Sequence, residues 1–300
     1  TYRAADAVLT VSDKESGLLA ELMGPERIFT IPLVESLDRS PIPFEQRRGI
    51  FYVGNFRHLP NGEAVEYLCR EVLPRLDPDL LAAHPLTVAG SRLDEKVREH
   101  GAGLANVNMI GWIPSVVPYL QRARVCAMPM LHGAGVKGKI VHALATGTPV
   151  VTTTVGAEGM PIRHREHALI ADSPGDLAAG LALLLTDSRE WRRLADAGYE
   201  LAAEEYAPQA AQERFGELVE SILELPVREG GGPAGASRMR RRELAYKQAV
   251  ESVAQTLETA TDPGSTVLVV SRGDDALVEL EGRSGAHFPQ APDGRWVGYH

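Results

Sequence analysis

The residues with the clearest chemical potential lie in one short segment, residues 132–151, where a glycine loop opens into an apolar helix. Gly133 and Gly135 let the backbone come close to a bound group, and a helix N-terminus presents free N–H donors with partial positive charge. Lys137 and Lys139 add two ammonium groups at the start of this helix. The combination predicts a site for a multiply charged anion, most simply a diphosphate. Because residues two apart lie on different sides of a helix, the two lysines are not expected to face the same way.

The same glycines also match a dinucleotide-binding fingerprint, Gly133-x-Gly135-x-x-Gly138, with Glu158 at a suitable distance. A true fingerprint places its first glycine on the turn that leaves a strand, usually in the first strand–helix unit. Here residues 128–132 separate the apparent strand from Gly133, and three strand–helix units come earlier. An NAD(P)-dependent Rossmann enzyme is therefore an alternative that the sequence leaves open without favouring it.

The elements that must position this segment follow an α/β pattern from Gly49 to about residue 225. Short apolar runs, most of them ending on glycine, alternate with helical periodicity, which is typical of a parallel sheet covered on both faces. Ligands of such sheets bind beyond the carboxyl ends of the strands. Strands are expected at 50–53, 86–89, 107–110, 124–129, 149–154 and 168–171, and helices at 60–73, 94–101, 115–122, from the glycine loop to 147, and at 173–185, 188–205 and 208–225.

This order of features resembles the C-terminal, donor-binding domain of GT-B glycosyltransferases of the group 1, family 4 type. The resemblance rests on the glycine loop, on a helix ending in Ala145-x-Gly147-x-Pro149-Val150-Val151, and on the following Gly156-Ala157-Glu158-Gly159. It covers roughly residues 4–225 and implies a Rossmann-like, doubly wound parallel sheet, the C-terminal half of a GT-B fold. It also implies transfer of a sugar from a nucleotide-diphosphate sugar, with retained anomeric configuration and with neither a metal nor another cofactor.

The resemblance implies two phosphate-binding loops. Gly54 and Asn55 would lie under the donor phosphates, and Arg57 in the same loop would contact them, because a guanidinium binds phosphate in a bidentate fork. An exposed loop arginine is the alternative. In the second loop, Lys139 would contact the diphosphate, and with Arg57 it is the expected catalytic group because both would stabilise leaving-group charge. The other expected ligands in the second loop are Gly133, Gly135, Val136 and Lys137, with a single binding lysine as the alternative.

The ribose end departs from the family pattern. Many members carry a Glu-x7-Glu pair across this helix, whereas Ala134 and His142 occupy the two places here. A neutral imidazole accepts one hydrogen bond through one nitrogen, whereas a carboxylate acts only as an acceptor. His142 is therefore either a donor ligand or a packed histidine, and Glu158 is either a substitute ligand or a surface turn residue. Loss of donor binding, which would leave a non-catalytic scaffold module, is the main alternative function.

Two further motifs need separate interpretation. The loop Gly111-Trp112-Ile113 corresponds to the family loop whose backbone contacts the nucleobase, so Ile113 is an expected donor contact. For Trp112 a packed indole is favoured over stacking on a base. Asp77-Pro78-Asp79 resembles a metal-binding Asp-x-Asp, but it follows a helix and is expected to end that helix. No His, Cys and carboxylate cluster has metal-ligand spacing.

The sequence pattern predicts five regions, which are domains or linkers. Residues 1–35, with strands near 7–11 and 27–31 around a helix, are expected to be the tail of a missing N-terminal acceptor domain. Both ends suggest a piece of a larger multidomain protein, so the chain alone is expected to bind donor weakly and not to turn over. The remaining regions are a Pro-rich linker at 36–48, the donor domain at 49–225, a Gly-rich linker at 226–237, and a helix with the start of an incomplete α/β domain at 238–300, including a strand at 266–270.

Composition restricts the class of protein and its partners. The chain has 300 residues, with 44% hydrophobic and 24% charged residues, as in ordinary soluble proteins, and a formal net charge of −9 argues against nucleic-acid binding. Cys69 and Cys126 lie in apolar settings and are expected to be buried thiols in a reducing compartment.

With no long apolar run or signal peptide, a cytoplasmic location is expected. The basic run 238–242 is expected to be a solvated helix face, with peripheral contact to anionic lipid or contact to nucleic acid as the alternative. The expected partners are a nucleotide-sugar donor and an unidentified sugar, lipid-linked or protein acceptor.

Overall fold

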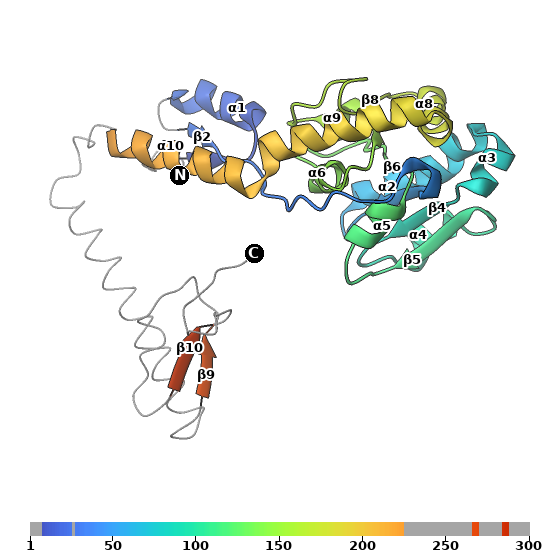
Figure 1. Ribbon diagram of the computed structural model, residues 1–300, viewed down its shortest axis with the longest axis horizontal. Helices are drawn as coiled ribbons and strands as arrows, with labels where there is room; N and C mark the ends of the chain where they lie inside the picture. The colour runs from blue at the N-terminus through green and yellow to red at the C-terminus, as the bar shows by residue number, and fades with distance from the viewer. Residues whose placement is uncertain (1–7, 26–27, 225–265, 270–283, 288–300) are drawn as a thin grey trace. The chain divides into compact units, whose positions relative to one another are not determined.

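The structure is a computed structural model that describes residues 8–25, 28–224, 266–269 and 284–287. The chain divides into two units, with the first ending at Glu224 and the second beginning at Leu225 (Figure 1). Each unit is described by itself below.

A six-stranded, fully parallel sheet forms the centre of the first unit, in the order β5-β4-β3-β6-β7-β8. The chain runs from β3 outward to β5, returns to the other side of β3 with β6, and continues outward to β8. The direction in which successive strands are added to the sheet therefore reverses between β3 and β6, as the prediction of a doubly wound sheet requires. Sheets of this kind bind ligands at this switch point. The strands are β3 (Ile50–Val53), β4 (Leu86–Ala89), β5 (Val107–Gly111), β6 (Val125–Met128), β7 (Val150–Thr152) and β8 (Leu169–Ile170).

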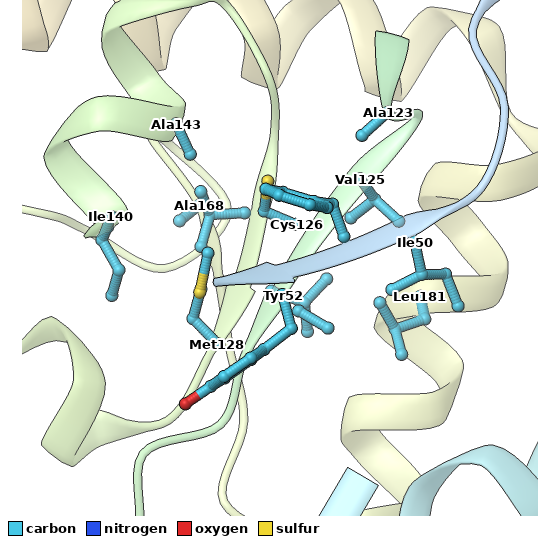
Figure 2. Packing of buried hydrophobic residues seen from close by; sticks show 14 of the residues in the cluster. Ile50, Tyr52, Ala123, Val125, Cys126, Met128, Ile140, Ala143, Ala168 and Leu181 are labelled. Atoms are coloured by element: carbon cyan, nitrogen blue, oxygen red, sulfur yellow. The ribbon is translucent and has the colours of Figure 1, made fainter. Parts of the chain in front are cut away.

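Helices cover both faces of this sheet. Figure 2 shows Ile140 and Ala143 of α6 on one side of β3 and β6, and Leu181 of α8 on the other. The long helix α9 packs along α6 and also contacts α8. The helices are α2 (Leu59–Tyr67), α3 (Pro78–Ala83), α4 (Glu95–Glu99), α5 (Val117–Arg122), α6 (Gly138–Ala145), α7 (Thr154–Ala157), α8 (Pro174–Thr186), α9 (Ser188–Tyr206) and α10 (Pro208–Glu224).

The core lies between these layers, and the short strands are buried on both faces. Tyr52 and Val125 are fully buried, and full burial of a large apolar side chain stabilises a fold by about 1.5–3 kcal/mol. Cys69 and Cys126 are buried free thiols, as predicted. Burial raises the pKa of Cys69 to about 12 and raises the pKa of Cys126 as well. Both thiols are therefore protonated and inert at neutral pH.

The helix expected over 60–73 is shorter than predicted. α2 ends at Tyr67 and continues as a π-helical turn over Leu68–Val72 and a 3₁₀ turn over Leu73–Arg75. Pro74 has no N–H to donate to the preceding turn, which explains why the regular ladder is lost before it.

The Asp-Pro-Asp motif follows the end of the preceding helical segment at Arg75, as predicted, and it also begins a new helix, which was not predicted. The Asp77 carboxylate accepts hydrogen bonds from the backbone N–H groups of Asp79 at 2.9 Å and Leu80 at 3.0 Å, which caps α3. Pro78 lies in the first turn, where its missing donor costs nothing. The same capping shortens the next expected helix to α4, because Asp94 caps it through the Val97 N–H at 3.0 Å. The helix expected from 115 begins only at Val117, in this case without a side-chain cap.

The strand expected over 149–154 ends at Thr152, because the next residue caps a helix. The Thr153 hydroxyl accepts from the Gly156 N–H at 3.0 Å and donates to the Met130 carbonyl at 2.5 Å. α7 therefore begins at Thr154. Sequence alone favoured a strand because threonines are β-branched, but here the hydroxyl group decides the local structure.

The N-terminal residues form a separate small sheet. β1 (Val8–Thr10) pairs in parallel with β2 (Ile28–Thr30), and α1 (Asp13–Met23) connects them with Ser12 as its N-cap. The irregular segment that follows is not linker throughout. Phe44 and Arg47, within the expected linker 36–48, are buried and belong to the core region of the donor domain.

The second unit contains one described feature. β9 (Thr266–Val269) pairs in parallel with β10 (Ser284–His287), and β9 corresponds to the strand expected at 266–270. The Gly-rich linker, the basic run and the helix expected after residue 238 lie outside the described residues. Within the part of the chain that the structure describes, no helix has both the length and the apolar character needed to span a membrane.

Candidate functional site

Two of the predicted loops meet where the strand order reverses. Residues 54–58 follow β3, and residues 129–137 follow β6. β3 and β6 are parallel neighbours, with Ile50 opposite Val125 and Phe51 opposite Cys126. Both loops therefore leave the same edge of the sheet, on the two sides of the switch point.

The β3 loop is closely packed around Asn61, which is buried. Its side-chain amide donates to the Asn55 carbonyl at 2.8 Å, and the Asn55 side-chain oxygen accepts from the Arg57 N–H at 3.1 Å. A Cβ atom on Gly54 would lie 2.9 Å from the Asn61 side chain, so this position has no room for one. The Arg57 side chain itself is exposed. The loop thus has a fixed backbone and presents a solvent-accessible guanidinium.

The β6 loop is shaped by its glycines and by Lys137. Gly133 and Gly135 have φ angles of 113° and 74°, which side-chain-bearing residues rarely adopt. The Lys137 ammonium donates to the carbonyls of both glycines, at 3.0 and 2.6 Å. Burial lowers the pKa of Lys137, although Glu158 opposes this shift. Lys137, which was expected to bind the donor diphosphate, therefore stabilises the conformation of its own loop.

Lys139 points away from this loop, toward β3. Its ammonium donates to the Tyr52 hydroxyl at 3.0 Å and to the Asn61 side-chain oxygen, and lies 3.4 Å from the Met130 sulfur. Burial, and to a smaller extent the nearby charge of Lys137, lowers the pKa of Lys139 to about 7. Among the described residues no carboxylate contacts this ammonium. The two lysines therefore face different groups, as expected, although Lys137 is the N-cap of α6 and has extended rather than helical backbone angles.

The contacts of Lys139 bring in residues that the sequence analysis did not assign to the site. Tyr52 lies inside a strand of apolar residues and gave no signal beyond core packing. Figure 2 shows its hydroxyl directed toward the rim of the packed cluster, away from Ile50. Asn61 stands in the Pro60-Asn61 pair at the start of α2, which was part of the expected loop but carried no role of its own.

His142 faces a carboxylate that sequence reasoning missed. Its Nδ1 lies 3.7 Å from Oε2 of Glu35, and the Glu35 N–H donates to the Tyr206 carbonyl at 2.8 Å. Both side chains are about one quarter exposed, at 27% and 24%. His142 is therefore not packed in the apolar core. No local signal could have revealed Glu35, because it belongs to a segment far from α6 in sequence.

Glu158 follows α7 and pairs with Lys14 of α1. The hydrogen bond from Lys14 lowers the pKa of Glu158, so this carboxylate is ionised at neutral pH. Together they border a hollow of about 380 Å³ that is also lined by Thr154, Val155, Ala157, Ile162 and Ile170. Glu158 is thus paired with a residue of the N-terminal segment.

The expected nucleobase loop lies farther along the sheet edge. Gly111 ends β5, and β4 separates β5 from β3. Trp112 is 71% exposed, so the prediction of a packed indole is wrong, and Ile113 is half-buried. Within the described ranges, no group of three or more His, Cys, Asp or Glu side chains is placed to hold a metal ion.

Comparison with protein families matches residues 47–187 to the model described as glycosyl transferases group 1. The matched range contains both loops of the switch point, α6 and Glu158, whereas Glu35 lies before it. A comparison with curated proteins finds no match.

Solved structures share the fold at low sequence identity. TarM from S. aureus, solved as a point mutant with fondaparinux, alpha-GlcNAc-glycerol and UDP, is 13% identical with a TM-score of 0.59, covering 71% of this chain and 43% of TarM. Sucrose-phosphate synthase from Thermosynechococcus elongatus is 20% identical with a TM-score of 0.58, covering 74% and 59%. HepE from Anabaena, in complex with UDP-glucose, is 14% identical with a TM-score of 0.59, covering 74% and 64%. The chain thus spans less than two thirds of each of these proteins.

Proposed function

Because residues 47–187 match the model described as glycosyl transferases group 1 and the chain shares the fold of solved GT-B glycosyltransferases, we propose that this protein transfers a sugar from a nucleotide-diphosphate sugar. The observation that carries the proposal is the convergence of two loops at the switch point between β3 and β6. One loop offers Arg57, and the other leads into the N-terminus of α6 with Lys139 in its first turn. Positive charge and free amides therefore lie where this class of sheet binds ligands.

The chemistry follows from charge development on the leaving group. When the sugar departs, negative charge accumulates on the nucleoside diphosphate, and fixed cations and N–H donors at that place lower the barrier. We assign this role to Arg57, Lys139 and the α6 N-terminus, with Lys137 holding Gly133 and Gly135 in shape. These groups supply the positive charge without a metal, and retention of anomeric configuration is proposed from the family resemblance.

UDP is the first donor nucleotide to test. TarM was solved with UDP, and HepE with UDP-glucose. The pneumococcal O-GlcNAc transferase GtfA, which is 17% identical with a TM-score of 0.58, was solved with UDP and GlcNAc. We propose a nucleotide-sugar donor and a sugar, lipid-linked or protein-bound acceptor that an N-terminal acceptor half would bind. A cytoplasmic location is part of the same proposal.

Calorimetry of the full chain with UDP, GDP and ADP tests donor binding. We expect weak but measurable binding of one nucleotide, and its loss in Lys139→Ala. Lys96→Ala, which removes an exposed lysine of α4, should leave binding unchanged and serves as the matched control. Absence of binding at millimolar concentrations of all three nucleotides would count decisively against the proposal.

A non-catalytic scaffold is the second candidate, and two observations favour it. Lys137 is bonded to its own loop, and His142 with Glu35 stands where the family pattern has a helix carboxylate. Sugar transfer by the full-length protein distinguishes the two functions. An enzyme should lose transfer with Lys139→Ala and keep or gain it with His142→Glu, whereas a scaffold should be indifferent to both.

The NAD(P)-dependent alternative has less support. Gly133 is separated from the end of β6 at Met128 by Pro129, Met130, Leu131 and His132, so it does not lie on the turn leaving the strand. A fluorescence titration with NADH and NADPH tests this alternative, and saturable binding would revive it.

A further inference from the structure

The ammonium of Lys139 is held in a cage of neutral groups. Its neighbours are the Tyr52 hydroxyl at 3.0 Å, the Asn61 side-chain oxygen and the Met130 sulfur at 3.4 Å, and it lies 4.6 Å from the centre of the Tyr52 ring. Tyr52 is fully buried and Asn61 is 8% exposed. The cage fixes the position of the ammonium, but none of its members carries a negative charge.

Asn61 is the central member, because it connects Lys139 to the β3 loop. Its side-chain oxygen accepts from Lys139, and it also accepts from the Tyr52 hydroxyl at 3.1 Å. Its NH₂ group donates to the Asn55 carbonyl at 2.8 Å. One buried amide therefore couples the first turn of α6 to the loop that carries Arg57.

A carboxylate at position 61 would have given the ammonium a permanent partner, as is usual for a buried lysine. The neutral amide holds the same position without cancelling the charge. A partly buried cation without a counter-charge is less stable than one in water and gains from an incoming anion. Because the cage contains no negative charge, binding of an anion to Lys139 is expected to be favourable.

Extending the proposed function, on which it rests, we propose that Asn61 is a positioning residue for the donor diphosphate. It holds the Lys139 ammonium at the switch point, where no carboxylate of the described residues contacts it, so that the diphosphate supplies the negative charge. Nucleotide binding then stabilises the protonated lysine and takes up a proton from solution above neutral pH.

Among the residues that the structure describes, two titratable groups face Lys139. Lys137 approaches from the N-cap of α6, and Tyr52 approaches from β3, where burial raises its pKa so that it stays neutral. Asn61 from α2 and Met130 from the β6 loop do not titrate. The pKa of Lys139 is about 7 in the free protein. Nucleotide terminal phosphates titrate near pH 6, so the range above pH 7 reports on the lysine.

The experiment measures binding of UDP, GDP and ADP to the full chain by calorimetry, at several pH values from about 7 to 9 and in buffers of different ionisation enthalpy. For the best-bound nucleotide, wild-type affinity should fall with rising pH, approaching about tenfold per unit, with uptake of up to about one proton. Asn61→Ala should weaken binding at pH 7 by about tenfold or more, because a charge-assisted contact is lost. Asn61→Asp should keep Lys139 protonated throughout, which flattens the pH dependence and abolishes proton uptake.

Asn108→Asp is the matched control, because it adds the same charge on the exposed face of β5 and should preserve the wild-type pH dependence. Thermal melting confirms that each variant is folded, and if Asn61→Asp does not fold, Asn61→Ala and wild-type proton uptake decide. If no nucleotide binds to wild type, the proposed function and this inference are both wrong. If wild type binds but takes up no proton, if Asn61→Asp keeps the wild-type slope, or if Asn61→Ala binds normally, the inference alone is overturned.

Discussion

Cations lie at both ends of strands β3 and β6: two buried arginines at the amino ends and the partly buried Lys139 at the carboxyl ends. The two ends differ in the partners that they give these cations. At the amino ends, Arg47 and Arg124 are 1% and 5% exposed. Arg47 donates to the Ile42 carbonyl and the Thr148 hydroxyl, both at 2.9 Å, and Arg124 donates to the carbonyls of Arg47 at 3.1 Å and Leu185 at 2.7 Å. At the carboxyl ends, the partners of Lys139 among the described residues are a phenol, an amide and a thioether.

Aromatic rings complete the amino-end cluster. The Arg47 guanidinium lies 4.8 Å from the centre of the Trp191 ring, and that of Arg124 lies 3.5 Å from the centre of the Phe44 ring. Burial lowers the pKa of each arginine only to about 10, so both stay charged at neutral pH. A guanidinium spreads its charge over a fork that several carbonyls can satisfy, whereas an ammonium concentrates it. At the arginine end every cation is therefore satisfied by protein groups, whereas at the lysine end we propose that a ligand supplies the counter-charge.

The largest expected effect is on stability at the amino ends. Arg47→Ala leaves the Thr148 hydroxyl and the Ile42 carbonyl without their donor and opens a cavity under Trp191, which should cost about 3 kcal/mol of unfolding free energy. Urea denaturation measures this loss, and nucleotide affinity of the folded protein should be unchanged. A loss of nucleotide affinity with little change in stability would show that the arginine end, and not only the lysine end, takes part in ligand binding.

Lys139→Met should have the opposite profile. The variant keeps an apolar stem in the cage and removes the cation, so nucleotide affinity should fall by about ten- to hundredfold while stability at pH 7 stays near that of wild type. Calorimetry and urea denaturation on the same samples give both numbers. Strong destabilisation with intact binding would show that Lys139 is a structural residue like Arg47.

The pH dependence of stability sharpens the comparison further. The unfolded lysine keeps its proton to about pH 10, whereas folded Lys139 loses it near 7, so between these values the unfolded state binds more protons. The unfolding free energy of wild type relative to Lys139→Met should therefore rise with pH above 7, by at most about 1.4 kcal/mol per unit. The corresponding difference for Arg47→Ala should stay flat from about pH 7 to pH 9. Denaturant titrations across this range distinguish the two slopes, and equal slopes would remove the distinction between the ends.

The smallest effect is expected where a charge already has an exposed partner. Lys14 pairs with Glu158, with side chains 55% and 31% exposed. Exposed pairs contribute little because solvent screens them, so Lys14→Met should change the unfolding free energy by less than about 1 kcal/mol. Urea denaturation in low and high salt provides the measurement. A larger, salt-sensitive loss would mean that this contact holds the N-terminal segment more firmly than its exposure suggests.

The α/β pattern, the strands and most helices could be predicted because apolar runs and helical periodicity are local properties. Departures occurred where one side chain changed the backbone pattern, as with Thr153 capping α7, Asp77 capping α3, and Pro74 after the π-helical turn. Trp112 was predicted to be packed and is exposed, since burial depends on distant chain that periodicity does not report.

By itself, the sequence determined the parallel α/β class, the glycine loop leading into α6, and the concentration of cations beside it, because residue type and spacing control backbone freedom and local charge. Only the tertiary structure decided what each cation contacts. It turned Lys137 onto its own loop, placed Lys139 in the Tyr52 and Asn61 cage, and brought Glu35 to His142. These contacts join residues far apart in the chain, and an ammonium becomes a ligand-binding group or a structural one according to the partners that folding brings to it.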